Sequence, residues 1–426
     1  MPDDAITVDL LGEQLGTLRQ TRAGAQWQAS EQALEKYGIG SLVLSVALPL
    51  DSSPSPVPAS EAFFGGLLPE GPRLDALLRD TPGSSRENLV GLLALTGRDA
   101  IGGVVLPGPP ITALGPALCQ EEVELEVANP RGYVAGGGSG IPGMQPKVAL
   151  ARAHGRWHAA RDGHPSTHIV KPFGPDSARG AHAQVWLMAL ARGIGLIDYQ
   201  VQFEQFGDIG AVVVERFDRV LLPDGGVGRV HQEDAAQALG LPWGGNAKFE
   251  WAGEGASLRA IARLLDRHRT ITDTGPSDRE ALLAHTVFRL LAGDTDGHAK
   301  NHGLLHSPDG GVTLAPLYDV TSQVLYGGTG EAVAMFIDGR RSLRDIDAGA
   351  LVREARTWGV QADVAARVIE SVALDTLEAA RTMPTPDAIA AHLPGYVTRA
   401  CGALLDGDTL GLALGEFPTL RSLEVQ

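Results

Sequence analysis

The sequence predicts an α+β chain with two lobes. From residue 147 to residue 217, short apolar and β-branched runs alternate with turn residues, which is typical of strands. From residue 232 onward, apolar residues recur at helical spacing. Strands that come first and helices that follow indicate an α+β fold or two lobes. A proline-rich break at residues 107–110 separates a smaller N-terminal part from this pattern.

Composition limits the classes of protein to which the chain can belong. With 426 residues, 44% hydrophobic and 20% charged, the chain is long enough for two or three packed domains. A net charge of -16 argues against nucleic-acid binding through the whole surface, because phosphate contacts need Lys and Arg. The two cysteines indicate a reducing compartment. The sequence has no signal-peptide pattern at its start and no run of 18 apolar residues, so we expect a cytoplasmic protein without a membrane span.

The N-terminal part, residues 1–107, is expected to be a small mixed domain. It opens with a hairpin over residues 6–18 and closes with a strand over 101–106. Between them the patterns predict a strand over 41–48, a Pro/Ser-rich loop over 51–60, a helix from Glu61, and a short helix over 88–96.

The remaining chain is expected to form a sheet lobe over residues 118–219 and a helical lobe over 226–426. The sheet lobe carries one helix, over 180–195, and its expected strands are 147–153, 168–173, 201–203 and 209–217. The expected helices of the second lobe are 233–240, 256–268 and 277–292, with several more from Asp347 to the end.

The strongest chemical signal is an acidic loop, residues 293–301, followed by an apolar run that ends at Asp319. Asp296, Asn301 five residues later and Asp319 are the residue types that phosphoryl transfer from Mg-ATP requires, one as a general base and two as metal ligands. A calcium-binding EF-hand loop is excluded, because its twelfth position is Leu305 rather than Glu. A zinc helix is disfavoured, because His298 and His302 lack the His-Glu-x-x-His pattern. A solvated acidic loop stays as the alternative.

A glycine run upstream contains G-x-G-x-x-G at Gly138, Gly140 and Gly143. A β-type run and Pro146 follow the motif where a dinucleotide-binding fold needs a helix, which disfavours that fold. The run suits either a loop whose backbone amides cover phosphates or a linker. Two further segments also have two interpretations. Lys171, inside an apolar strand, suits a phosphate grip or a charged strand edge. Residues 214–218 suit a hinge beside adenine or an ordinary strand end.

Taken in order, these segments resemble the HipA family of bacterial serine/threonine kinases, the toxins of toxin–antitoxin pairs. The resemblance covers nearly the whole chain. In the N-terminal domain it rests on residues 63–71 and 97–103, and in the kinase domain on residues 143–147, 168–173, 215–219, 231–234, 293–301 and 314–319. It implies a two-lobed protein-kinase-like fold, with the small mixed N-terminal domain packed on the N-lobe and a mostly helical C-lobe.

The resemblance also implies roles for individual residues. Asp296 would be the general base, and Asn301 and Asp319 the magnesium ligands. Lys171 would grip the α- and β-phosphates of ATP, and Glu215 and Phe217 would contact adenine. The other residues expected to contact or surround the nucleotide are Pro142, Gly143, Met144, Gln145, Lys147, Arg216, His298, Lys300 and Tyr318.

The resemblance also implies partners. The expected partners are a protein substrate with a Ser or Thr and a small helix-turn-helix antitoxin, and the chain would contact DNA only through that antitoxin.

The chain departs from the family pattern at two positions. Gly140 occupies the position at which relatives carry an autophosphorylated serine, with Ser139 the nearest hydroxyl. The helix over 180–195 lacks the Glu that pairs with the strand lysine in kinases, and Gln184 is its central polar residue. A small-molecule kinase and a degenerate kinase that acts as a co-repressor stay as alternatives.

Overall fold

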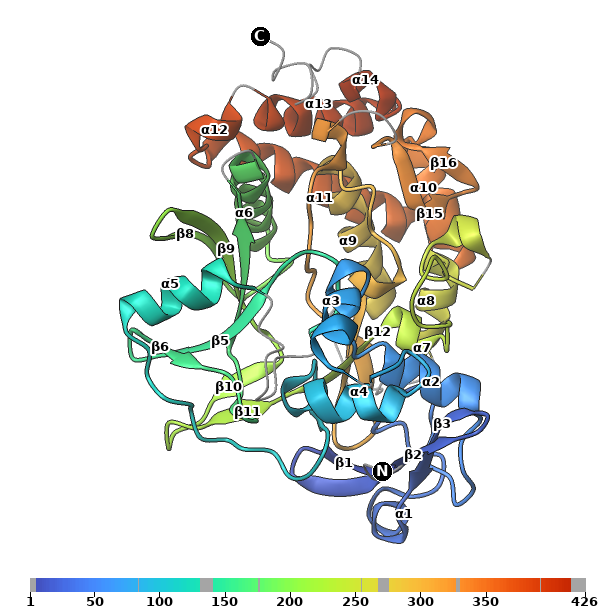
Figure 1. Ribbon diagram of the computed structural model, residues 1–426. Coiled ribbons are helices and arrows are strands. Elements are labelled where there is room, and N and C mark those ends of the chain that lie inside the picture. The colour runs from blue at the N-terminus through green and yellow to red at the C-terminus, as the bar shows by residue number, and fades with distance from the viewer. Residues whose placement is uncertain are drawn as a thin grey trace. The chain divides into compact units, whose positions relative to one another are not determined.

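The computed structural model describes residues 5–82, 84–130, 141–174, 177–253, 255–266, 276–326, 330–390 and 392–414. The glycine run, with Gly138, Ser139 and Gly140, lies outside the described residues. The chain divides into two compact units, shown as ribbons in Figure 1. The first unit comprises residues 1–175, 204–247 and 304–312, and the second comprises 176–203, 248–303 and 313–426.

The first unit begins with a four-stranded sheet in the order β3-β2-β1-β4. Antiparallel pairing of β1 with β2 confirms the expected hairpin. Helices α2 and α4 pack on this sheet around a core that includes Phe63, Phe64 and Trp27. The elements are β1 (Ala5–Leu10), β2 (Glu13–Thr21), β3 (Gly24–Ala29), α1 (Glu31–Tyr37), α2 (Val57–Gly65), α3 (Pro72–Asp80), α4 (Leu89–Thr96) and β4 (Val104–Val105).

The prediction of a strand over residues 41–48 is wrong. The segment is irregular although Val43, Leu44 and Leu48 are buried. The Glu233 carboxylate accepts hydrogen bonds from the Val46 backbone (2.9 Å) and the Ser45 hydroxyl (2.6 Å). A buried side chain from a distant part of the sequence therefore takes the place of a strand partner. The strand expected over 101–106 shrinks to the two residues of β4, and the expected loop over 51–60 already contains the start of α2.

A five-stranded sheet, in the order β6-β5-β7-β9-β8, forms the other part of the first unit. Helix α5, which the sequence patterns did not predict, packs on it through Val123 and Val127. The elements are α5 (Gln120–Ala128), β5 (Val148–Ala153), β6 (Arg156–Ala159), β7 (His168–Phe173), β8 (Val201–Phe206) and β9 (Ile209–Glu215). Short pieces complete the unit: β10 (Arg219–Leu221), β11 (Val227–Arg229), β12 (His231–Asp234), α7 (Ala235–Ala238) and β13 (Gly303–His306).

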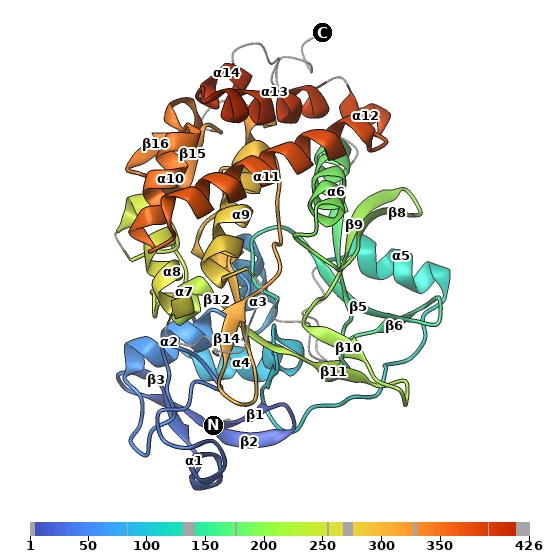
Figure 2. The same cartoon turned by 180° about the vertical axis from the view of Figure 1, so that it is seen from behind.

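The second unit is mainly helical, as expected. The long helix α11 packs against α9, α10 and α13, and Figure 2 shows it running across α9. The helices are α6 (Ala178–Gly193), α8 (Leu258–Asp266), α9 (Asp278–Leu291), α10 (Ala348–Thr357), α11 (Ala362–Thr382), α12 (Asp387–Ala390), α13 (Leu393–Asp406) and α14 (Gly411–Leu414). The strands are β14 (Val312–Leu314) and an unpredicted hairpin of β15 (Ala332–Ile337) and β16 (Arg340–Ser342).

The predicted fold class, a mixed chain with a strand-rich and a helix-rich part, is confirmed. Among the described residues, no helix combines the length and the apolar character that a membrane crossing demands.

Candidate active site

The acidic loop begins where helix α9 ends. The Ser277 side chain caps the start of α9 by accepting the Glu280 backbone N–H, and the helix ends at Leu291. Gly293 then turns the chain with a φ of +69°. A Cβ at this position would lie 2.5 Å from Val324 Cγ2 and 2.9 Å from Ser322 Oγ. Both the left-handed backbone and the close approach therefore require glycine.

Gly293→Ala is expected to destabilise the second unit by roughly 2–5 kcal/mol, from left-handed strain plus steric overlap. Thermal unfolding of the full chain measures the effect. The matched control is Gly402→Ala in α13, where no atom lies within 4 Å of the added methyl group. There alanine should stabilise the helix by up to about 1 kcal/mol. Equal melting temperatures for the two variants would contradict this account of the turn.

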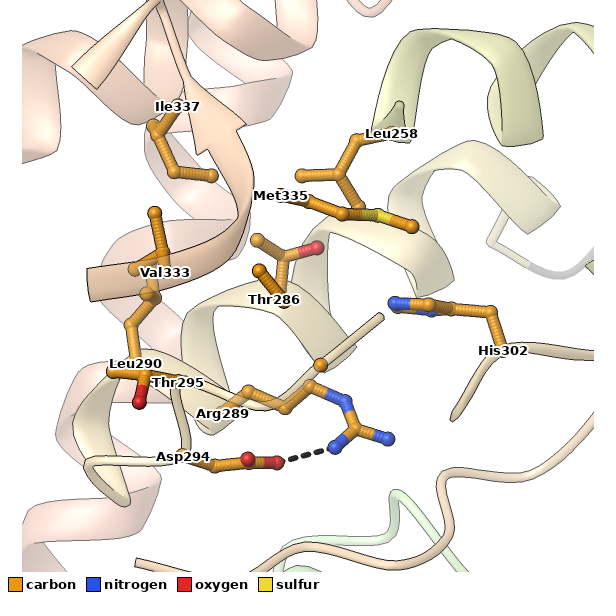
Figure 3. A pocket seen from close by; sticks show the side chains of 12 residues that line it. Leu258, Thr286, Arg289, Leu290, Asp294, Thr295, His302, Val333, Met335 and Ile337 are labelled. Carbon is orange, nitrogen blue, oxygen red and sulfur yellow. Dashed lines mark hydrogen bonds and ion pairs between the residues drawn. The ribbon is translucent and has the colours of Figure 1, made fainter. Parts of the chain in front are cut away.

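Asp294, the second residue of the acidic loop, is buried and is only 2% exposed. One carboxylate oxygen pairs with Arg289 of α9, an interaction drawn in Figure 3. The other accepts the backbone N–H of Asp296 at 3.1 Å. Burial raises the pKa of Asp294 to about 7, even though Arg289 acts in the opposite direction. Asp294 thus supports the loop from inside rather than facing solvent.

Asp296 and Asn301 form a closed turn at the surface. The side chain of Asp296 is exposed. Its backbone carbonyl accepts a bond from the Asn301 amide nitrogen (2.9 Å) and another from the His298 backbone N–H (2.7 Å). His298 itself is 7% exposed, and its ring meets that of Phe249 edge-on at 5.1 Å. The turn therefore presents the Asp296 carboxylate outward and fixes the Asn301 side chain beside it.

Asp319 follows β14 and has an exposed side chain on a strained backbone. Its φ of +54° lies in the left-handed region, which is uncommon for residues other than glycine. Its Oδ1 accepts a hydrogen bond from Gln184 of α6 at 3.0 Å. Strain of this kind persists only where the surroundings enforce it, and it is concentrated at functional sites.

Hydrogen bonds tie the Asp319 segment to the acidic loop. The Tyr318 hydroxyl donates to the Lys300 carbonyl at 2.7 Å, so Tyr318 and Lys300 lie together. The buried Tyr199 hydroxyl donates to the Leu317 carbonyl at 2.7 Å, and burial raises its pKa. The second unit therefore gathers the predicted base, the two predicted metal ligands and Lys300 with Tyr318 around one loop.

The oxygen atoms of this set fit magnesium. Carboxylate and amide oxygens are hard ligands, and Mg²⁺ is commonly bound by one or two protein groups together with water and substrate phosphates. Within the described ranges there is no group of three or more His, Cys, Asp and Glu side chains suited to a metal ion. Asp319 and Asn301 match the sparse ligation that a phosphate-bound magnesium ion needs.

The remaining predicted residues belong to the first unit. Lys171 on β7 pairs with Val212 of β9 and is 6% exposed. Lys147 donates to the Pro142 carbonyl at 2.6 Å and closes the segment 142–147 into a tight loop. Arg73 of α3 anchors that loop by donating to the Ile141 carbonyl (2.7 Å) and the Gly143 carbonyl (3.1 Å). The Met144 side chain is 58% exposed.

Arg216 was expected to contact the nucleotide, and its side chain lies in the protein interior. Its side chain is 2% exposed. It donates to both Asp218 oxygens (2.8 and 2.7 Å), to Ser166 Oγ and to the Ala100 carbonyl. These bonds commit the guanidinium to the interior, so the prediction for Arg216 concerns its backbone at the end of β9. Arg216 stays in the prediction with its partly buried neighbours Glu215 and Phe217.

Arg216 is one member of a buried ionic cluster, whose other members are Asp99, Asp218, Arg219 and Arg229. Burial acts to raise the pKa values of Asp99 and Asp218, but the arginines outweigh it, so both pKa values fall below the usual range. Since Asp99 comes from the N-terminal domain and Arg216 follows the five-stranded sheet, the cluster joins the two parts of the first unit.

Comparisons with known proteins find relatives of this chain. Residues 6–106 match the HipA N-terminal domain, and residues 139–380 match the HipA-like C-terminal domain. The Sinorhizobium fredii protein Y4mE, named as a kinase, is 33% identical over 355 residues, which cover 79% of this chain and 82% of that protein. The serine/threonine-protein kinase toxin HipA of Shewanella oneidensis is 29% identical over 316 residues, covering 69% and 70%.

A solved structure shares the fold. It is the Shewanella oneidensis toxin–antitoxin complex of HipA, HipB and operator DNA, in which a chain matches with a TM-score of 0.79 at 24% identity. The match covers 96% of this chain and 99% of that chain. The domain matches and the 33% identical relative establish that this chain belongs to the HipA family.

Proposed function

We propose that this chain is a serine/threonine protein kinase that uses Mg-ATP. The observation that carries the proposal is the arrangement of Asp296, Asn301 and Asp319 in the second unit. Hydrogen bonds hold the Asp296 backbone, the Asn301 amide and the Asp319 carboxylate, and Asp319 sits on a strained backbone. Phosphoryl transfer depends almost entirely on such positioning and on electrostatics.

The proposed chemistry assigns one task to each of these residues. Asp296 accepts the proton of the substrate hydroxyl as that oxygen forms its bond to the γ-phosphorus and the bond to the ADP oxygen breaks. The side-chain oxygens of Asn301 and Asp319 would hold the magnesium ion. When bound, the ion neutralises charge on the phosphates. Gln184 orients the Asp319 carboxylate by donating to Oδ1.

Residues of the first unit are proposed to bind the nucleotide. Lys171 offers a cationic side chain to the α- and β-phosphates. The tight loop of residues 142–145, closed by Lys147, offers backbone groups to the nucleotide. Glu215 and Phe217 are proposed as the contacts to adenine, and His298 and Lys300 of the second unit as the lining of the phosphate site.

We further propose that the kinase is the toxin of a toxin–antitoxin pair. Support comes from the 29% identical relative, which is named as a kinase toxin. The proposed partner is a small helix-turn-helix antitoxin that carries the DNA contacts. A chain with a net charge of -16 is poorly suited to making such contacts with its whole surface. The proposed consequence of kinase activity is growth arrest through phosphorylation of a cellular protein.

Incubation of the purified chain with bacterial lysate and γ-labelled ATP tests the proposal. We expect magnesium-dependent label on serine or threonine of a protein band, together with thermal stabilisation of the chain by Mg-ATP. Label confined to metabolites would indicate a small-molecule kinase instead. If the chain shows no phosphoryl transfer and no stabilisation by Mg-ATP, that result would indicate a degenerate kinase, and thus a co-repressor role.

A further inference from the structure

Arg289 connects the segments that carry the proposed catalytic groups, although nothing in the sequence singled it out. It lies in the last turn of α9 and is 3% exposed. Its Nη1 pairs with Asp294, and its Nη2 donates to the carbonyls of Asn301 (2.9 Å) and Tyr318 (2.7 Å). One guanidinium group thus contacts three separate points of the chain.

Each of those points is next to a proposed catalytic group. Asn301 is itself a proposed metal ligand, and Tyr318 directly precedes the other, Asp319. Asp294 accepts the backbone N–H of Asp296, the proposed base. Because a guanidinium group is planar and its donors are fixed in a fork, these bonds also set the spacing between the two ligand-bearing segments.

A cavity of about 30 Å³ lies against the loop, lined by Arg289, Asp294, Gly297, His302 and residues of β15 (Figure 3). That volume corresponds to roughly one or two water molecules. The Arg289 stem also packs under Gly297, where an added Cβ would lie 3.0 Å from Arg289 Cδ. The Arg289 side chain therefore supports the loop at the edge of this cavity.

We propose that Arg289 is a positioning residue that sets the separation of Asn301 and Asp319 and so tunes the affinity of the site for the metal ion. This inference rests on the proposed function. Arg289 does not touch the nucleotide in this scheme. It acts through the backbones of the residues that do.

Arg289→Lys keeps the positive charge but loses the planar guanidinium group and its fixed N–H donors. We expect the Mg²⁺ concentration for half-maximal phosphoryl transfer to rise about 10- to 100-fold, the range seen when a residue that supports metal ligands is removed. Binding of Mn²⁺ in the presence of ATP, followed by electron paramagnetic resonance, should weaken to the same extent. Arg279→Lys, in the first turn of the same helix, is the matched control and should leave both values unchanged.

A second variant covers the case in which a buried lysine prevents folding. Arg289→Met combined with Asp294→Asn removes the ion pair without leaving an isolated charge, while the new amide oxygen can still accept the Asp296 N–H. The same weakening of Mn²⁺ binding is expected. Wild-type metal dependence in either folded variant overturns the inference but leaves the proposed function intact. A wild-type chain that neither binds Mg-ATP nor transfers phosphate removes both.

Discussion

Asp296→Asn is expected to lower phosphoryl transfer by roughly 100- to 10,000-fold, the usual contribution of a positioned general base. The amide that replaces the carboxylate cannot accept the proton of the attacking hydroxyl. The fold should survive, because the Asp296 side chain is exposed and the hydrogen bonds that shape the turn use its backbone. The loss should therefore appear in the rate at saturating ATP rather than in nucleotide binding.

Single-turnover transfer of labelled γ-phosphate measures this effect, and thermal stabilisation by Mg-ATP reports on binding. The matched control is Asp406→Asn, which neutralises another exposed carboxylate of the second unit, at the end of α13. It should behave like the wild type. Full activity in Asp296→Asn would remove this residue as the base and with it the assignment as a kinase.

Asp218→Asn is expected to cost roughly 3–5 kcal/mol of stability, because it leaves buried arginines without one of their two carboxylate partners. Asp218 is 2% exposed and accepts bonds from Arg216, from Arg219 and from the Gly102 backbone (2.7 Å). Removing the Asp218 charge leaves unpaired positive charge buried between the N-terminal domain and the five-stranded sheet. The melting temperature of the full chain should fall by roughly 6–20 °C.

The control for Asp218→Asn is Asp363→Asn, which breaks an exposed pair with Arg367 on α11. No measurable change is expected there, since water screens such pairs. The pKa of Asp218 in the folded chain is lowered, so its stabilising contribution is complete above the usual carboxyl pKa and is lost as the pH falls below it. The variant should therefore lose less stability than the wild type between pH 5 and pH 2. An unchanged melting temperature at neutral pH would show that the cluster is dispensable.

Local signals in the sequence predicted the parts of the fold that depend on short-range patterns. The helix that ends near Ala292 and the acidic loop after it follow from helical periodicity and turn residues close by. The prediction of a strand over residues 41–48 failed because the polar partner of this segment, Glu233, lies nearly two hundred residues away in the sequence. No window of sequence contains that contact.

The candidate site divides in the same way. Asp296, Asn301 and Asp319 were predicted because their residue types and spacing are typical of phosphoryl transfer. Arg289 and Asp294 were missed because one resembles any helix-end arginine and the other any loop acid. The buried bonds of the Arg216 side chain were not predicted, because its partners Asp99 and Ser166 lie far away in the sequence. Only the folded chain brings such groups together.

At Asp319, the left-handed backbone favours glycine, whereas the proposed reaction requires a carboxylate. Glycine would relax the main chain there, yet it would delete the oxygen atoms that the proposed reaction uses. Selection for robustness alone would favour the smaller residue. An aspartate at this position implies that the chain gives up some conformational ease to keep an anion in place.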